Sequence, residues 1–182
     1  EAKGMFKEGA KIFSSPQTCH GLPWIFQDSH LQARKQRQNI EFYCWDIAAV
    51  LERRSIIEKP GDFEILPGLK VYVPQMGHTA GNAGIVIPTA SGKKGFITSD
   101  MCPQNQPITQ GMELPSKSWP REWIPDEIWG TDLTYAQTPE SSMDEEVQSL
   151  VRSVDKALKK GKKVVIAAFG NGRGQNIAYW LS

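Results

Sequence analysis

The chain has 182 residues, of which 40% are hydrophobic and 23% charged, and this composition is typical of a folded globular protein rather than a disordered one. The 21 basic and 20 acidic residues give a formal net charge of +1. The net charge therefore gives no sign of general attraction to nucleic acid, and any such binding needs a local basic surface or a metal site.

Three widely spaced cysteines, Cys19, Cys44 and Cys102, form no Cys-x-x-Cys pair. They support neither a zinc ribbon nor a disulfide framework, and reduced thiols in a cytoplasmic protein are the preferred interpretation. No apolar run approaches the roughly 20 residues that a membrane helix needs, and no signal peptide opens the sequence. Glu1 begins without Met in a helix-like stretch and Ser182 ends one turn into an apolar pattern. We expect the sequence to be incomplete at both ends.

In chain order, the first elements are short. Residues 11–14 are predicted to form a strand that ends before Pro16. Residues 28–40 are polar and basic and predict an exposed helix, whose charges indicate a solvated face more often than a binding site. Residues 46–53 predict a short helix with an apolar side.

Strands follow from residue 65 onward. Residues 69–73 alternate in polarity as a half-buried strand does, and residues 82–87 and 95–98 predict a hairpin around Ser91-Gly92. Five prolines within residues 102–127 exclude long regular elements. Residues 128–131 predict a strand that ends at Asp132. The nearby Trp119, Trp123 and Trp129 could stack on bases, but a role in pinning this segment to the core is favoured.

The clearest predicted helix begins at Ser142, where Ser142-x-x-Glu145 is a capping box, and it ends at Gly161. Its apolar residues fall on one stripe. Residues 163–169 form a continuous apolar run that predicts a parallel strand buried on both faces. A glycine-rich turn over residues 170–175 then leads into a last helix. This order predicts α/β packing with a right-handed crossover.

Two residues stand out for their chemistry. His78 lies in a turn with glycines on both sides, directly after a strand, and Asp100 follows another strand 22 residues later. If the strands pair as neighbours, an imidazole and a carboxylate emerge at one edge of the sheet, where they suit Zn²⁺, Mn²⁺ or Fe. From the residues alone, an ordinary turn histidine and a turn-capping aspartate remain the commoner interpretations, and a catalytic metal site needs at least three ligands.

Four segments, in this order, resemble motifs of one family. Gly77-His-Thr-Ala-Gly81 and Phe96-Ile-Thr-Ser-Asp100 resemble the third and fourth metal motifs of the metallo-β-lactamase superfamily. Thr131-Asp-Leu-Thr-Tyr135 and the segment 161–175, with its Gly-Arg-Gly-Gln ending, resemble motifs of the β-CASP branch, which processes RNA and DNA. The resemblance covers most of residues 65–182.

The resemblance implies an α/β fold: a partial metallo-β-lactamase αββα sandwich over residues 1–140 and the start of a β-CASP cap domain over residues 141–182. It implies that His78 binds one metal ion and Asp100 bridges two. It also implies a catalytic role for Asp132, as a carboxylate that orients a ligand or relays a proton. Arg173 and Gln175 are candidates for substrate binding at a helix N-terminus, although glycine packing with an internal ion pair of Arg173 is slightly favoured.

The implied activity is a zinc-dependent ribonuclease, endonucleolytic or 5′-exonucleolytic, with two Zn²⁺ ions in the complete protein and Mn²⁺ or Fe as alternatives. The implied partner is single-stranded RNA, with DNA as an alternative, no membrane, and a homodimer or a processing complex as open assemblies. The chain departs from the family in lacking the His-x-His-x-Asp-His signature, which we expect before residue 1. A further metal-binding His is expected beyond Ser182, so residues 1–182 alone are expected to be inactive.

Two smaller departures, Ala167-Ala168 in place of Pro-Ala and Leu133 in place of Ser, affect no ligand. Two other functions stay open. The first is a non-catalytic paralogue that scaffolds RNA processing. The second is a small-molecule hydrolase of the same fold, against which the helix and strand over residues 143–169 argue.

Overall fold

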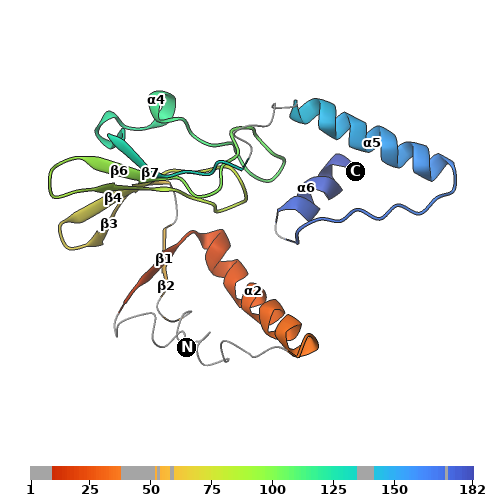
Figure 1. The fold of residues 1–182 in the computed structure, drawn as a ribbon, viewed down its shortest axis with the longest axis horizontal. Helices are drawn as coiled ribbons and strands as arrows, with labels where there is room; N and C mark the ends of the chain where they lie inside the picture. The colour runs from red at the N-terminus through yellow and green to blue at the C-terminus, as the bar shows by residue number, and fades with distance from the viewer. Residues whose placement is uncertain (1–9, 38–51, 53, 58–59, 135–141, 171) are drawn as a thin grey trace. The chain divides into compact units, whose positions relative to one another are not determined.

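The computed structural model describes residues 10–37, 52, 54–57, 60–134, 142–170 and 172–182 (Figure 1). By its internal contacts the chain divides into two compact units, Glu1–Phe63 and Glu64–Ser182. The domain boundary predicted between residues 140 and 141 falls at the edge of a segment outside the described residues, and it stays a prediction. So does the short helix over residues 46–53, of which only Glu52 is described.

The first unit pairs two short parallel strands, β1 (Ile12–Ser14) and β2 (Arg54–Ile56), beside the helix α2 (Pro16–Lys35). The helix begins 12 residues earlier than the predicted residue 28, so that prediction was wrong about its start. Ser15 caps it by accepting a hydrogen bond from the Thr18 amide at 3.2 Å, and Pro16 occupies the first helical position. The Ser-Pro pair was therefore the signal for a helix start, and not only for the end of a strand.

A mixed five-stranded sheet in the order β3-β4-β5-β6-β7 forms the base of the second unit, although its first strand begins before the boundary at residue 63. Its strands are β3 (Gly61–Leu66), β4 (Leu69–Val73), β5 (Ile85–Pro88), β6 (Lys94–Ile97) and β7 (Glu127–Gly130). Strands β4, β5 and β6 run antiparallel in turn, which confirms the predicted hairpin, and β7 lies parallel to β6. The coarse prediction of a mixed α/β fold is confirmed.

An aromatic core fixes the long segment after β6 against the sheet. Trp119 packs between Tyr72 and Phe96, with ring centroids 5.3 and 5.0 Å away, and Trp123 stacks on Tyr72 at 5.8 Å. Within this segment only α4 (Pro115–Ser118) and a single 3₁₀ turn, η1 (Arg121–Trp123), are helical among the described residues. The preference for a core role is therefore confirmed for Trp119 and Trp123. Trp129 instead lies half-exposed over Gly95.

The C-terminal helices are α5 (Met143–Lys159) and α6 (Arg173–Trp180). Ser142 is the N-cap of α5 as predicted, but its side chain makes no capping hydrogen bond, so the capping box does not form. The C-terminal turn ends at Gly161 with φ 69°. None of the helices in the described ranges is both long and apolar enough to cross a bilayer.

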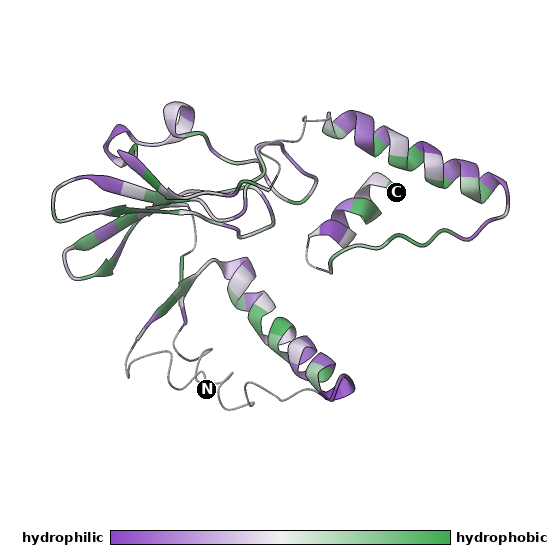
Figure 2. Cartoon of the chain, viewed as in Figure 1, coloured by the Kyte–Doolittle hydropathy of each residue, from purple (hydrophilic) through white to green (hydrophobic). Residues whose placement is uncertain are grey.

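The predicted strand over residues 163–169 is wrong. The segment is hydrophobic (Figure 2), yet it pairs with none of the described strands and all its side chains are exposed, Val165 by 94%. A buried parallel strand needs hydrogen-bonding neighbours on both edges, and no described segment supplies them. The right-handed crossover that depended on this strand is absent from the described residues as well.

Candidate metal centre

The turn that carries His78 lies beside the segment that carries Asp100. Beyond the end of β4, Gly77 pairs with Met101 in an antiparallel bridge, and the Cys102 amide donates to the Met76 carbonyl at 2.9 Å. This isolated bridge brings the residues next to it, His78 and Asp100, close to one another. The pairing is made beyond the strand ends, because β5 separates β4 from β6 in the sheet itself.

The residue before His78 has to be glycine for two reasons: its backbone has a positive φ, and a side chain there would clash with neighbouring backbone atoms. Gly77 has φ 74°, and a Cβ built on it would lie 2.3 Å from the Cys102 carbonyl oxygen and 2.5 Å from the Met112 nitrogen. Gly81, at the other end of the turn, has φ 82°. The turn can therefore close tightly against the neighbouring backbone and present the imidazole at the end of the strand.

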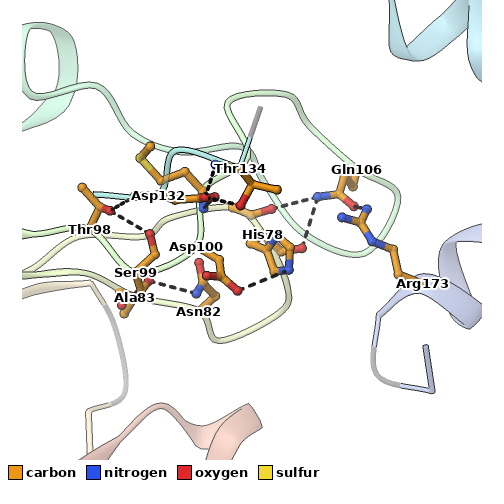
Figure 3. Close-up of polar contacts among 12 residues, drawn as sticks. His78, Asn82, Ala83, Thr98, Ser99, Asp100, Gln106, Asp132, Thr134 and Arg173 are labelled. Atoms are coloured by element: carbon orange, nitrogen blue, oxygen red, sulfur yellow. Dashed lines mark hydrogen bonds and ion pairs between the residues drawn. The ribbon is translucent and has the colours of Figure 1, made fainter. Parts of the chain in front are cut away.

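A hydroxyl network holds the residue before Asp100. Ser99 has φ 60°, a left-handed conformation that is uncommon for a residue with a side chain. Its hydroxyl donates to the Ala83 carbonyl at 3.0 Å and accepts from the Asn82 side-chain amide at 3.1 Å (Figure 3). These contacts fix the unusual backbone conformation that directs Asp100 toward His78.

His78 Nε2 lies 3.8 Å from Asp100 Oδ2, with the two side chains 34% and 72% exposed (Figure 3). This separation is too long for a hydrogen bond, so the lone pairs of the two groups are not used by one another. Two ligand atoms of a tetrahedral zinc ion lie about 3.4 Å apart, and rotation of the exposed Asp100 carboxylate can remove the difference. The two groups are therefore candidate ligands for one ion.

Within the described residues, no cluster of three or more His, Cys, Asp or Glu side chains is placed to hold a metal ion. The pair fits a metal as half of a site, and a complete site needs at least one more ligand from elsewhere.

Asp132 lies at the end of β7 and points back toward this pair. Its Oδ2 accepts from the Met101 amide at 3.2 Å, and its Oδ1 accepts from the Thr134 hydroxyl at 2.6 Å and the Thr134 amide at 2.9 Å. Its own amide donates to the buried Thr98 hydroxyl at 3.2 Å. Both carboxylate oxygens therefore accept hydrogen bonds from the protein, and one of the donors is the amide of Met101, the residue after Asp100.

The pKa of Asp132 is lowered from its ordinary value. The Thr134 hydroxyl is the largest cause, followed by the amides of Thr134 and Met101, with a small contribution from the charge of His78. A carboxylate with a lowered pKa that already accepts three hydrogen bonds is a poor proton acceptor. Of the two roles considered for Asp132, orientation of the Asp100 segment fits this environment better than proton relay.

The two candidate substrate residues differ in their surroundings. Arg173, at the start of α6, is half-buried, and its Nη1 donates to the Gln106 side-chain oxygen at 3.0 Å. This contact is a hydrogen bond to a neutral amide, so the expected internal ion pair is not what holds Arg173 among the described residues. Gln175 is exposed on α6.

Sequence reasoning missed the residues that support the site: Thr98, Ser99, Gln106, Thr134 and Asn176. Thr134 could have been found, because an aspartate two residues before a threonine commonly closes a turn through its own side chain. Gln106 carries no local signal, since its partners lie 28, 29, 67 and 70 residues away in the chain.

No protein-family model matches the chain, and a search of curated proteins finds no matching relative.

Proposed function

We propose that this chain belongs to a metal-dependent phosphodiester hydrolase of the metallo-β-lactamase type, in the β-CASP branch, and that its substrate is single-stranded RNA. The observation that carries the proposal is the proximity of His78 and Asp100, whose Nε2 and Oδ2 atoms lie 3.8 Å apart. The four ordered motifs over residues 65–182 support the family, and the mixed sheet is compatible with it.

In this proposal His78 and Asp100 would both hold the metal, with Zn²⁺ as the ion and Mn²⁺ or Fe as alternatives. When bound, the ions would supply Lewis acidity, which polarises a phosphodiester and lowers the pKa of water. Asp132 holds the Met101 amide and so orients Asp100. The remaining ligands have to come from residues other than those described, because these provide only two.

A small-molecule hydrolase of the same fold is the weaker alternative. Of the helix and the strand after Asp132 that distinguish this chain from such a hydrolase, only the helix α5 is present among the described residues. RNA as the substrate is therefore supported mainly by the motif around Asp132 and by the segment leading to Arg173. RNA scaffolding without catalysis is a separate outcome of the test below.

The test uses the full-length protein with a fluorescent single-stranded RNA in the presence of Zn²⁺ or Mn²⁺. His78→Ala and Asp100→Asn should each lower the cleavage rate at least about 100-fold, because each removes a ligand on which charge stabilisation depends. His20→Ala is the matched control, because this exposed histidine lies on α2, and it should leave the rate unchanged.

The outcomes separate the candidates. Cleavage that survives both substitutions would overturn the roles assigned to His78 and Asp100. Tight RNA binding without cleavage in the wild type would indicate the scaffold, and hydrolysis of a small ester or thioester without action on RNA would indicate the other hydrolase class.

A further inference from the structure

One buried amide joins the His78 turn to the start of α6. Gln106 is only 7% exposed. Its Nε2 donates to the Gly77 carbonyl at 2.8 Å and lies 3.4 Å from the His78 carbonyl. Its Oε1 accepts from Arg173 Nη1 at 3.0 Å (Figure 3) and from Asn176 Nδ2 at 2.8 Å. Both ends of one side chain are therefore engaged, each by a different segment.

The direction of this amide is fixed by its partners. A carbonyl oxygen can only accept, so the NH₂ group has to face Gly77, and a guanidinium can only donate, so the oxygen has to face Arg173. A flipped amide would place acceptor against acceptor at one end and donor against donor at the other. Gln106 thus has a single arrangement that satisfies both segments.

Asn176 depends on the same amide. The Asn176 side chain is 2% exposed, and its Oδ1 has no hydrogen-bond partner among the described residues. The bond from its Nδ2 to Gln106 is therefore the hydrogen bond that holds this side chain. A second contact lies beside it: a Cβ built on Gly172, the N-cap of α6, would lie 3.4 Å from Thr79 Cγ2. The start of α6 therefore packs directly on the residue that follows His78.

We propose that Gln106 is a positioning residue that couples the N-terminus of α6 to His78, so that a change at Arg173 is transmitted to the metal-binding turn. The coupling itself follows from the hydrogen bonds, and its link to catalysis rests on the proposed function of His78. Arg173 then acts through Gln106, and a ligand that draws its guanidinium away would remove one of the contacts that position Gln106 against the backbone at Gly77 and His78.

The experiment is a double-mutant cycle on the full chain, followed by NMR. Arg173→Met removes one of the two donors from α6 to the Gln106 oxygen, Gln106→Leu removes the contacts of that amide with both segments, and the double variant completes the cycle. The first readout needs no metal. In the wild-type background, Arg173→Met should shift the backbone amide signals of Gly77 and His78. In the Gln106→Leu background, adding Arg173→Met should cause no further shift of these signals. A merely structural role would give additive shifts.

The second readout is the apparent Kd of Mn²⁺, measured by broadening of the His78 signals. Arg173→Met should weaken Mn²⁺ binding about tenfold, the low end of what loss of a supporting hydrogen bond costs a metal site, and by no more than about twofold in the Gln106→Leu background. Gln110→Glu, on an exposed side chain of the same loop, is the control, and it should change neither readout.

A further variant, Gln106→Glu, allows the coupling to be tested if Gln106→Leu does not fold. The glutamate keeps an acceptor for Arg173 but has no donor for the Gly77 carbonyl. It should shift the Gly77 and His78 amides and leave those of α6 near their wild-type positions. Unchanged Gly77 and His78 signals in Arg173→Met, or additive changes around the cycle, would overturn the coupling. Absence of Mn²⁺ broadening in the wild type would overturn the metal-binding role of His78, and the amide shifts would still decide the coupling.

Discussion

At the scale of single residues, Asp132 is held ionised by its hydrogen bonds. Its pKa lies below the ordinary value because Thr134 and Met101 donate to the charged form. Since the pKa in the folded state is lowered, the stabilisation is present above the unfolded value of about 3.9 and is lost as the pH falls through the folded value. At neutral pH Asp132 therefore has no proton to donate to a leaving group.

Thr134→Val removes the largest of these contributions and keeps the Thr134 amide. The pKa of Asp132, followed through its carboxyl carbon signal in an NMR titration, should rise toward the ordinary value and should not pass it. A wild-type pKa at or above the ordinary value would show that these hydrogen bonds do not form, and it would reopen the proton-relay role.

Gly77 and Gly68 form a matched pair for testing the tight turn. Both have positive φ, 74° and 78°, but a Cβ on Gly77 would strike backbone atoms at 2.3 Å, whereas nothing lies within 4 Å of one on Gly68. Gly68→Ala should lower the free energy of unfolding by about 1 kcal/mol, the conformational cost alone. Gly77→Ala should cost at least about 2 kcal/mol more, as measured by urea unfolding. Equal losses would contradict the close approach of the two segments.

The sequence predicted the proximity of His78 and Asp100 better than it predicted the residues that support them. His78 and Asp100 could be found because short motifs mark strand ends with glycine and polar residues. Gln106 could not be found, because its role depends on three segments that meet only in the fold. The predicted contact between His78 and Asp100 is made, but through a direct pairing of Gly77 with Met101 and not through adjacent strands of the sheet.

At the scale of elements, local patterns predicted those elements whose stability is mainly local. The helix α5 and the β5–β6 hairpin appear as expected, because periodicity and turn residues specify them within a short stretch. The apolar run over residues 163–169 failed because a parallel strand is defined by its neighbours, which no local pattern supplies. The start of α2 was missed because Pro16 was interpreted only as the end of a strand.

Substitution of two valines tests whether the apolar run over residues 163–169 is packed or exposed. Val165 is 94% exposed and Val86 is fully buried in β5. Val165→Ala should change the free energy of unfolding by less than about 0.5 kcal/mol, and Val86→Ala should cost about 2 kcal/mol through lost burial and a cavity. A large loss at Val165 would mean that the segment is packed in solution.

At the scale of the whole molecule, the described chain brings together two candidate ligands, one supporting carboxylate and one buried amide, all within the unit Glu64–Ser182. Only the coarse mixed α/β class could be predicted from the helical and strand patterns, and the helix–strand order over residues 142–175 that was used for it contained the strand that does not form. The division into two units at residue 63 could not be predicted, because the boundary falls inside β3, where the sequence carries no linker.

A half-site of two ligands should bind metal weakly, because two contacts do not offset the dehydration of the ion. Residues 1–182 are therefore expected to show no sub-micromolar two-metal site with Zn²⁺ in calorimetry. Tight binding of two ions would mean that these residues hold more ligands than the described pair.

The most direct test of the central claim is Mn²⁺ titration of this chain, followed by paramagnetic broadening of assigned side-chain NMR signals. The signals of the His78 ring and the Asp100 carboxyl should broaden together, before any others. His78→Ala should abolish the broadening at Asp100, and Asp100→Asn should abolish the broadening at His78. Asp155→Asn, which removes an exposed carboxylate on α5, should change neither. Broadening that begins elsewhere, or that persists at one residue when the other is removed, would contradict a shared metal site.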